Sequence, residues 1–488
     1  PCTMTPSPPP LLPIAIIGSG PHALALVCKL YEESVDPFEE NPANAKLFRQ
    51  HDGKVTSKYK GLKALKSETR GAIRKKLKVT QGRRAEMRRI SSHIRVFDTR
   101  GTWCAQWDQQ FKNLGITVLR SALNAHVDPT SWEALEVDLN ERKDRERETV
   151  EFHELDADKS YRGPFQLPTS RRYRQFTQQV IRRYGLQDKV EKKTLVKIRK
   201  SEDHFELEFE TGERVFAKNV VLGCGPLCVP HWPEVFSAYD KERCLVRGLL
   251  LHSCDYMKMS PENLDAVLGA KRRIVVVGGG LTSAHIALSL CSRSLQTNVI
   301  FVARKPLQVK PFDIDSRWMG TQRNIQLAKY WSIRSPEQRF KLINETRGGG
   351  SITPVVWENL QEARERQQLT LLEDTEIVDL EVTLNAAPWN VILNTGEEYA
   401  ADLIVVSTGT ETNVHHDPLL SQLVEESTAL YQDRFPLVTE DLRLNVEENV
   451  FLLGVYASYQ LGPGALNLMG ARAGAARISK ALKQQLEW

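Results

Sequence analysis

Two short glycine-rich turns are the residues in this chain best suited to chemistry. Each follows an apolar run, residues 13–17 and 273–277, and each precedes a run with the apolar spacing of a helix. In a strand–turn–helix unit, the first glycine makes the turn, the second lets the backbone approach a pyrophosphate, and the third position must be small. Phosphate oxygens then meet unpaired N–H groups at the positive end of the helix. One such turn could be only a tight connection, but two in one chain predict two dinucleotide sites.

The residues after the next strand distinguish these two sites. After the second turn, strand 298–302 runs into Arg304 and Lys305, where an acid would hold a ribose 2′-hydroxyl. Because cations attract a 2′-phosphate, this site favours NADPH, with a solvated basic loop as the alternative. After the first turn, strand 93–97 runs into Asp98, which suits a nucleotide without a 2′-phosphate, such as FAD; a helix or turn cap is the alternative. The cofactor-binding residues that we expect in the two turns are Gly18, Gly20, Pro21 and Ala23, and Gly278, Gly280, Leu281 and Ser283.

Asp98 comes 80 residues after Gly18, instead of about 20. The excess is explained by a basic insertion, about residues 44–90, which has sixteen Lys or Arg and three acidic residues. The net charge of the whole chain, +5, is therefore due to this segment alone. A disordered or surface-lying insertion is the simplest interpretation, and binding of RNA or an anionic membrane surface is the alternative.

Two further apolar runs end in glycine, at Gly225 and Gly409, which we also expect to be cofactor-binding residues. In folds with two dinucleotide sites, the chain leaves the flavin domain near the first such ending and re-enters it near the second. We therefore predict an α/β fold with two Rossmann-like domains, in which an NADPH domain (231–404) is inserted in an FAD domain (11–230 and 405–488).

Composition excludes several other classes. With 41% hydrophobic and 26% charged residues, the chain is typical of a soluble globular protein, and no apolar run reaches the length of a membrane span. Its eight cysteines are sparse and include no C-x-x-C pair, which argues against a disulfide scaffold, a zinc ribbon and a dithiol reductase. No H-E-x-x-H metal motif is present. We expect a cytoplasmic protein with free thiols and no bound metal.

Residues 246–256, VRGLLLHSCDY, resemble the G-x-x-x-H-S-x-x-Y segment that precedes the NADPH turn in class B flavin-dependent monooxygenases. A second stretch is similar to the lysine/ornithine N-monooxygenase pattern: Gln106-Trp107-Asp108, then residues 114–122, then Asp128-Pro129. Arg120 occupies the place of the family's lysine, which holds the substrate carboxylate. Gly115 and Asp108 stand where the family has Gln and His, and these departures leave the particular amine open.

The resemblance implies an FAD- and NADPH-dependent monooxygenase that hydroxylates a soft nucleophile, an amine nitrogen or a sulfur, through a flavin hydroperoxide. It implies roles near the reacting groups for Gln106, Trp107, Arg120 and His252; for the last two a structural role is the alternative. Gly464 opens a small-residue helix that in similar flavoproteins points its N-terminus at the flavin pyrimidine edge.

The partners implied are O₂ and a small nucleophilic substrate. We do not expect a nucleic-acid partner, because the basic insertion has few aromatic residues for base stacking. A homo-oligomer is left open. The competing interpretations are a non-catalytic FAD- and NADPH-binding module whose insertion binds a partner, and an NADPH-dependent flavin reductase.

Overall fold

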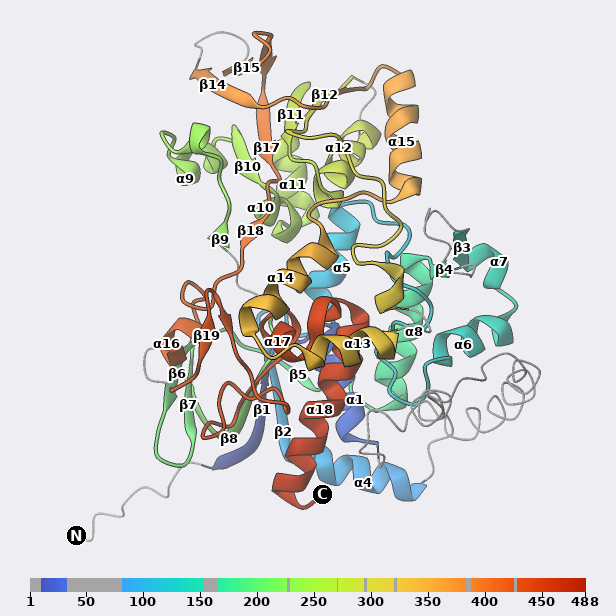
Figure 1. Cartoon of the computed structure of the whole chain (residues 1–488), viewed down its shortest axis with the longest axis vertical. Coiled ribbons are helices and arrows are strands. Elements are labelled where there is room, and N and C mark those ends of the chain that lie inside the picture. The colour runs from blue at the N-terminus through green and yellow to red at the C-terminus, as the bar shows by residue number, and fades with distance from the viewer. Residues whose placement is uncertain are drawn as a thin grey trace.

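The computed structural model describes residues 10–32, 81–152, 165–225, 229–269, 271–293, 296–319, 323–382, 388–424 and 428–488. The described elements form two lobes, one above the other in Figure 1, and each is built around a sheet with parallel central strands. This arrangement confirms the predicted α/β fold class. Residues 44–80 of the predicted basic insertion lie outside the described residues, and its remainder lies in α4 (Gln81–Ser92).

The lower lobe contains a seven-stranded sheet in the order β5-β2-β1-β8-β7-β6, with β21 also paired to β8. Strands β1, β2, β5, β8 and β21 run parallel, whereas β6 and β7 form an antiparallel extension. The strands are β1 (Leu11–Ile17), β2 (Ile94–Asp98), β5 (Val190–Lys192), β6 (Leu195–Lys200), β7 (Phe205–Phe209), β8 (Arg214–Leu222) and β21 (Val450–Leu452).

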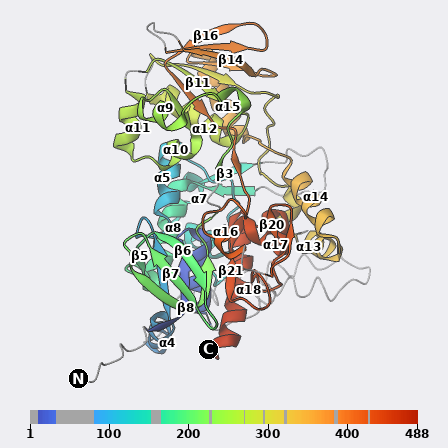
Figure 2. The same cartoon turned by 90° about the vertical axis from the view of Figure 1, so that its left-hand side faces the viewer.

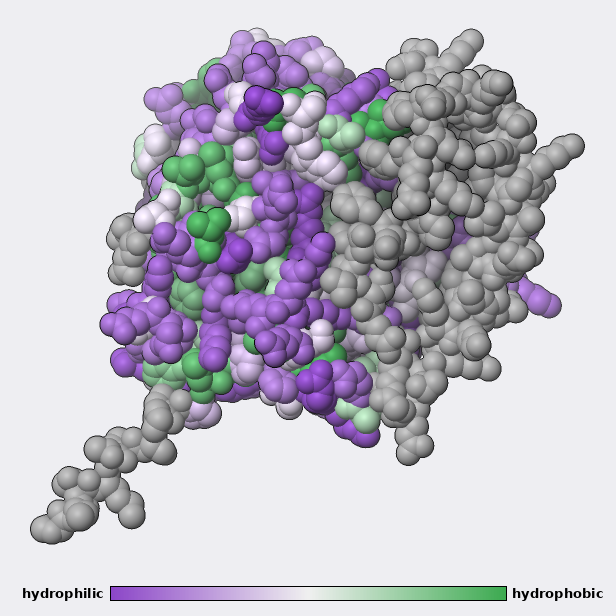
Figure 3. Space-filling model, turned by 60° about the horizontal axis from the view of Figure 1, so that its bottom comes forward, coloured by the Kyte–Doolittle hydropathy of each residue, from purple (hydrophilic) through white to green (hydrophobic). Residues whose placement is uncertain are grey.

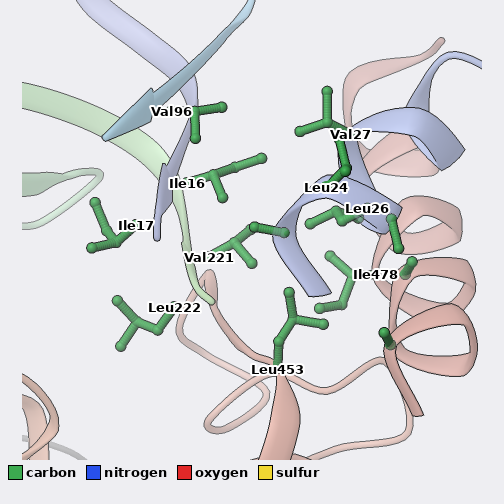
Figure 4. Close-up of a cluster of buried hydrophobic side chains, with 14 of the residues drawn as sticks. Ile16, Ile17, Leu24, Leu26, Val27, Val96, Val221, Leu222, Leu453 and Ile478 are labelled. Carbon is green, nitrogen blue, oxygen red and sulfur yellow. The ribbon is translucent and has the colours of Figure 1, made fainter. Parts of the chain in front are cut away.

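Strand β1 is apolar along its length because both of its faces are covered. Ile14 and Ile16 are fully buried, as expected for the centre of a parallel sheet. Helices α1 (Pro21–Leu30) and α18 (Leu468–Leu486) pack against each other over this region. In Figure 4, Leu24 of α1, Ile478 of α18 and strand residues such as Val221 meet in one apolar cluster. The first glycine turn is therefore adjacent to a well-buried apolar core.

The upper lobe contains a five-stranded parallel sheet in the order β10-β17-β11-β12-β13. An antiparallel three-stranded sheet, β14-β15-β16, lies at its outer end (Figure 2). The strands are β10 (Leu250–His252), β11 (Arg273–Val277), β12 (Asn298–Val302), β13 (Leu369–Leu372), β14 (Ile377–Val382), β15 (Trp389–Leu393), β16 (Glu398–Ala401) and β17 (Leu403–Val406).

The chain passes between the lobes twice, and the two passages lie side by side. Strand β9 (Val229–Pro230) leaves the lower lobe and pairs antiparallel with β18 (Thr410–Glu411), which returns to it. The predicted return at residue 405 falls inside β17, which pairs with β10 and β11 of the upper sheet. The return therefore lies a few residues later than the sequence indicated, because the apolar run that ends at Gly409 belongs to the upper sheet.

The other elements cover the sheets or connect them (Figures 1 and 2). Around the lower lobe and the junction lie α5 (Ala105–Asn113), α6 (Ala134–Arg142), α7 (Arg145–Glu148), β3 (Thr149–Phe152), β4 (Phe165–Pro168), α8 (Ser170–Arg183), α16 (Leu420–Val424), β19 (Tyr431–Gln432), β20 (Phe435–Pro436) and α17 (Ser458–Leu461). The chain between β9 and β18, which we call the upper-lobe segment, contains α9 (Lys241–Val246), α10 (Ser253–Lys258), α11 (Pro261–Leu268), α12 (Leu281–Arg293), α13 (Arg323–Ser332), α14 (Pro336–Arg347) and α15 (Pro354–Glu365). Of these helices, α13 and α14 lie beside α17 and α18 of the lower lobe (Figure 1).

Among the residues that are coloured in Figure 3, hydrophilic ones predominate, and hydrophobic ones form small separate groups between them. Among the helices that the structure describes, none has both the length and the hydropathy needed to cross a membrane.

A buried ion pair fixes the loop that follows residue 125 to helix α8. Asp128 is fully buried, and its Oδ2 accepts a hydrogen bond from Nη1 of Arg183 at 2.5 Å. Its Oδ1 accepts from the backbone and hydroxyl of Thr130. Burial alone raises the pKa of Asp128, but Arg183 and Thr130 outweigh it and lower that pKa below its ordinary value.

We expect Asp128→Asn to lower the free energy of unfolding by about 3 kcal/mol, because it leaves the Arg183 charge buried without its counter-charge. The matched control is Asp203→Asn, whose side chain is 79% exposed and should change stability by less than about 0.5 kcal/mol. Since the pKa of Asp128 is lowered on folding, its stabilisation is present above the unfolded pKa and is lost as pH falls through the folded pKa. Denaturant titrations between pH 7 and pH 3 measure both effects, and equal stability of the two variants would contradict this assignment.

Candidate active site

The first glycine turn lies where β1 ends and α1 begins. Gly18 has a φ of +99°, and a Cβ at this position would lie 2.6 Å from backbone atoms of Cys224, so only glycine fits. A Cβ at Gly20 would have no neighbouring atom within 4 Å. Pro21 begins α1, and Ala23 is fully buried. The positive end of α1 therefore faces open space beside a bare backbone, as a bound pyrophosphate requires.

Asp98 ends β2, directly beside this turn. Because β1 and β2 are parallel neighbours, its carboxylate stands at the same sheet edge as Gly18. Its Oδ2 accepts from the backbone N–H of Ser19 at 3.1 Å, and its Oδ1 accepts from that of Arg100 at 2.7 Å. Asp98 thus caps the turns around it and also occupies the ribose-contact position, so both roles predicted for it are compatible with the geometry.

The second glycine turn repeats this arrangement between β11 and α12. Gly278 has a φ of +138°, and a Cβ there would lie 2.2 Å from the carbonyl oxygen of Ser407. The N–H of Gly280 donates to Oγ of Ser283 at 3.0 Å, and the Ser283 hydroxyl donates to the carbonyl of Gly280 at 2.7 Å. Leu281 is the first residue of α12. Hydrogen bonds between Gly280 and Ser283 therefore stabilise the turn, and the N-terminal N–H groups of α12 lie at the edge of the parallel sheet.

Arg304 and Lys305 follow β12, the parallel neighbour of β11. Val302 is in register with Val277, so both cations lie just beyond the sheet edge that carries Gly278. Both side chains are exposed. Their position suits a contact with a ribose 2′-phosphate, and their role as NADPH ligands stays a prediction.

The three other predicted cofactor residues fall in two places. Gly225 (φ +73°) and Gly409 (φ +89°) each lie within a few residues of the paired passages β9 and β18. The carbonyl of Gly409 accepts from the N–H of His231 at 3.1 Å, so Gly409 is part of the junction itself. Gly464 lies in the short turn before α18, near Ile314 of the upper-lobe segment.

The predicted Gln106-Trp107-Asp108 motif lies on α5, where its side chains are engaged with other protein groups. Oε1 of Gln106 accepts from Nη2 of Arg100 at 2.9 Å. The Trp107 ring packs against Phe111 (centroids 4.1 Å apart) and Tyr173 (5.4 Å). Asp108 pairs with Arg174 of α8 at 2.8 Å, and burial raises its pKa although Arg174 opposes that shift. These contacts fix α5 to α8 and to the turn after β2.

Arg120 is also engaged with the protein. Its guanidinium donates to the carbonyls of Lys310 (2.9 Å), Pro311 (3.3 Å) and Ser351 (3.1 Å), and to the Ser351 hydroxyl (2.8 Å). These four bonds occupy four of the five N–H groups of the arginine. The expectation that Arg120 grips a substrate carboxylate through two parallel bonds is therefore not supported by the geometry.

His252 ends β10 and is fully buried. Its Nδ1 accepts from the N–H of Cys254, which caps α10, and its ring lies 5.1 Å from that of Trp232. Burial lowers its pKa to about 4, so the imidazole is neutral near pH 7. The contacts of His252 place it beside the junction of the lobes, and they agree with the structural role that was the alternative for this residue.

The sequence did not indicate that the segments around Asp313 and Gly350 contact the start of α18 and the second glycine turn. Gly350 packs on Gly280, because a Cβ at Gly350 would lie 3.1 Å from the Cα of Gly280. Asp313 accepts from Asn467, the N-cap residue of α18, at 3.2 Å. The run of three glycines at 348–350 was the one signal that could have drawn attention to this region.

Solved structures share the whole fold at low sequence identity. An ornithine N-hydroxylase from Kutzneria sp. 744 aligns with a TM-score of 0.62 and 16% identity, over 98% of this chain and 100% of that one. The L-lysine 6-monooxygenase of Pseudomonas syringae aligns with a TM-score of 0.60 and 17% identity, over 97% of this chain and 99% of that one. The cadaverine monooxygenase of Erwinia amylovora aligns with a TM-score of 0.60 and 14% identity, over 97% of this chain and 95% of that one. A comparison with curated protein sequences finds no match.

Two parallel sheets, each with a glycine turn at its edge, and a paired junction between them are the architecture of a flavoprotein with two dinucleotide-binding domains. The family model described as L-lysine 6-monooxygenase/L-ornithine 5-monooxygenase matches residues 167–412. The chain belongs to this family. It is accordingly an FAD- and NADPH-dependent monooxygenase of the N-hydroxylating type.

The two glycines of the first turn should respond differently to substitution. Gly18→Ala should prevent stable folding, because its Cβ overlaps the backbone of Cys224. Gly20→Ala has room in the protein, so it should fold with nearly unchanged melting temperature yet weaken FAD binding at least about tenfold by obstructing the phosphate. Flavin absorbance per protein and thermal unfolding without added FAD measure the two effects. Full FAD content in Gly20→Ala would remove the first turn from the cofactor site.

Proposed function

We propose that the protein hydroxylates the terminal nitrogen of a short aliphatic amine, a diamine or a diamino acid. The observation that carries this proposal is the presence of two bare glycine turns at the carboxyl edges of two parallel sheets, in a chain of the lysine/ornithine monooxygenase family. The solved proteins of similar fold are named for ornithine, lysine and cadaverine, which share a primary amine on an unbranched chain.

In this proposal FAD binds at the first turn and NADPH at the second. Gly18, Gly20 and the N-terminus of α1 hold the FAD pyrophosphate, and Asp98 holds its ribose. Gly278, Gly280 and the N-terminus of α12 hold the NADPH pyrophosphate. The corresponding domains are residues 11–230 with the C-terminal part, and the segment between the two passages. FAD held by these residues would supply the acceptance of a hydride from NADPH and the activation of O₂, chemistry that amino-acid side chains do not supply.

The protein's own residues supply position and electrostatics. Helix α18 has 19 residues, and its N-terminus, capped at Asn467, favours negative charge on a group placed there. The neutral imidazole of His252 and the paired strands β9 and β18 hold the junction without adding a charge beside it. The carboxylate of Asp108 is likewise paired within the protein, with Arg174 of α8.

The direct test is the product. Protein loaded with FAD is incubated with NADPH, O₂ and each of ornithine, lysine, putrescine and cadaverine, and the amine is analysed by mass spectrometry for one added oxygen atom. We expect one of these amines to yield a hydroxylamine together with amine-dependent NADPH oxidation. NADPH oxidation that yields only hydrogen peroxide with all four amines would instead favour an oxidase or reductase.

Arg304→Ala should raise the apparent KM for NADPH about tenfold, equivalent to ~1.4 kcal/mol, because one charged contact with the 2′-phosphate is lost. The KM for NADH should stay unchanged, since NADH has no 2′-phosphate. Lys305→Ala should act in the same direction. Steady-state oxidation of both nucleotides checks this, and an equal loss with NADPH and NADH would place Arg304 outside the nucleotide site.

A further inference from the structure

Arg120 joins the lower lobe to the upper-lobe segment. It belongs to the stretch that follows α5, in which the carbonyl of Thr117 accepts from Ser170 and the N–H of Leu119 donates to Pro168. Its guanidinium reaches Lys310, Pro311 and Ser351, about 190 and 231 residues further along the chain. One side chain thus ties together three chain segments that are distant in sequence.

The bonding partners of Arg120 are suited to fixing a backbone. Three of its four acceptors are main-chain carbonyl oxygens, which cannot move without moving the chain, and the fourth is the hydroxyl of the buried Ser351. Burial lowers the pKa of Arg120 to about 10, so the guanidinium stays protonated at neutral pH. Charged donors make stronger hydrogen bonds than neutral ones, and in a half-buried site water competes less for them.

The segment held by Arg120 is in contact with the second glycine turn. Ser351 follows Gly350, and Gly350 lies so close to Gly280 that a Cβ would come within 3.1 Å of the Gly280 Cα. Val309 and Ile352 form a bridge that joins the two strips of chain bonded to Arg120. A displacement of Ser351 is therefore transmitted to the turn through rigid backbone contacts.

The same strips of chain are also fixed to the start of α18. Asp313 pairs with Arg347 at 2.9 Å and accepts from Asn467 at 3.2 Å. Arg347 also donates to the carbonyl of Pro463 at 3.0 Å. Arg120, Ser351, Asp313, Arg347 and Asn467, which we call the interlobe clasp, hence connect the second turn with the N-terminus of α18.

We propose that Arg120 is a positioning residue, which through the interlobe clasp sets the placement of the NADPH turn relative to the flavin side of the junction. This inference rests on the proposed function, because it takes the two turns to hold NADPH and FAD. The step that it controls is the transfer of a hydride, two electrons with one proton, from NADPH to FAD. The substrate carboxylate, where the substrate has one, is not its ligand.

The first experiment follows flavin reduction by NADPH under anaerobic conditions, without any amine, by rapid mixing. Arg120→Gln should slow reduction at saturating NADPH about tenfold or more, because small displacements of reacting groups cause large losses of rate. Arg120→Lys, which keeps the charge but not the fork, should recover part of the rate. Ser351→Ala removes one acceptor and should slow reduction less. The control is Arg199→Gln, an exposed arginine that pairs with Glu206 and Glu208.

The second experiment separates positioning from carboxylate binding. Ornithine and putrescine, and likewise lysine and cadaverine, differ only in the α-carboxylate. If Arg120 positions the turn, Arg120→Gln leaves the ratio of kcat/KM within each pair unchanged. A selective loss for ornithine or lysine, with a normal rate of flavin reduction, would overturn the proposal.

A third measurement does not require turnover. Hydrogen exchange of peptides covering residues 346–353 should accelerate in Arg120→Gln and Ser351→Ala, both with and without FAD, while peptides of β6 and β7 stay protected. If Arg120→Gln does not fold, Ser351→Ala decides: normal exchange and normal flavin reduction in that variant would refute the clasp. Because flavin reduction is measured without amine, loss of amine hydroxylation in the parent protein would contradict the proposed function and leave this test unaffected.

Discussion

The close approach of backbone to backbone at Gly18 and Gly278 is the constraint on which the site depends. In each turn the chain leaves a buried parallel strand, reverses, and begins a helix within three residues, and a single Cβ would overlap Cys224 or Ser407. The reversal aims the N–H groups of the helix away from the sheet, where they can meet an anion. The dinucleotide sites are thus a consequence of how tightly strand and helix are joined.

Because this constraint acts within each lobe, other contacts must fix the position of one lobe relative to the other. Each turn is fixed to its own sheet by apolar packing, but hydride transfer requires two turns on different sheets to hold their ligands within contact distance. The paired passages β9 and β18 alone provide only two residues of ladder on each strand. Further hydrogen bonds connect the stretch around α5 with the upper-lobe segment. Asn113 donates to the carbonyls of Tyr256 and Met259, and Arg120 donates to those of Lys310 and Ser351. Directional hydrogen bonds suit this task because they specify a distance and an angle, which apolar contact does not.

The sequence predicted the parts of this structure that depend on local patterns. Strands 273–277 and 298–302 coincide with β11 and β12, and the glycine turns after β1 and β11 lie where their spacing placed them. Tertiary contacts decided the parts that it did not predict. Nothing local shows that Arg120 finds its acceptors at 310, 311 and 351, or that Gly350 rests on Gly280, since these contacts join residues far apart in the chain. Resemblance to the family suggested a substrate ligand at Arg120, because a motif transfers the position of a residue but not the contacts of its side chain.

The three departures from the family pattern have one local explanation. Helix α5 ends at Asn113, and Gly115 (φ +62°) closes it in the left-handed conformation, where glycine is strongly favoured over glutamine. The N–H of Ile116 returns to the carbonyl of Phe111, which completes this C-terminal cap. Asp108 pairs with α8 on one side of the same stretch, and Arg120 bonds to the upper-lobe segment on the other. All three residues therefore serve the docking of this stretch between the lobes.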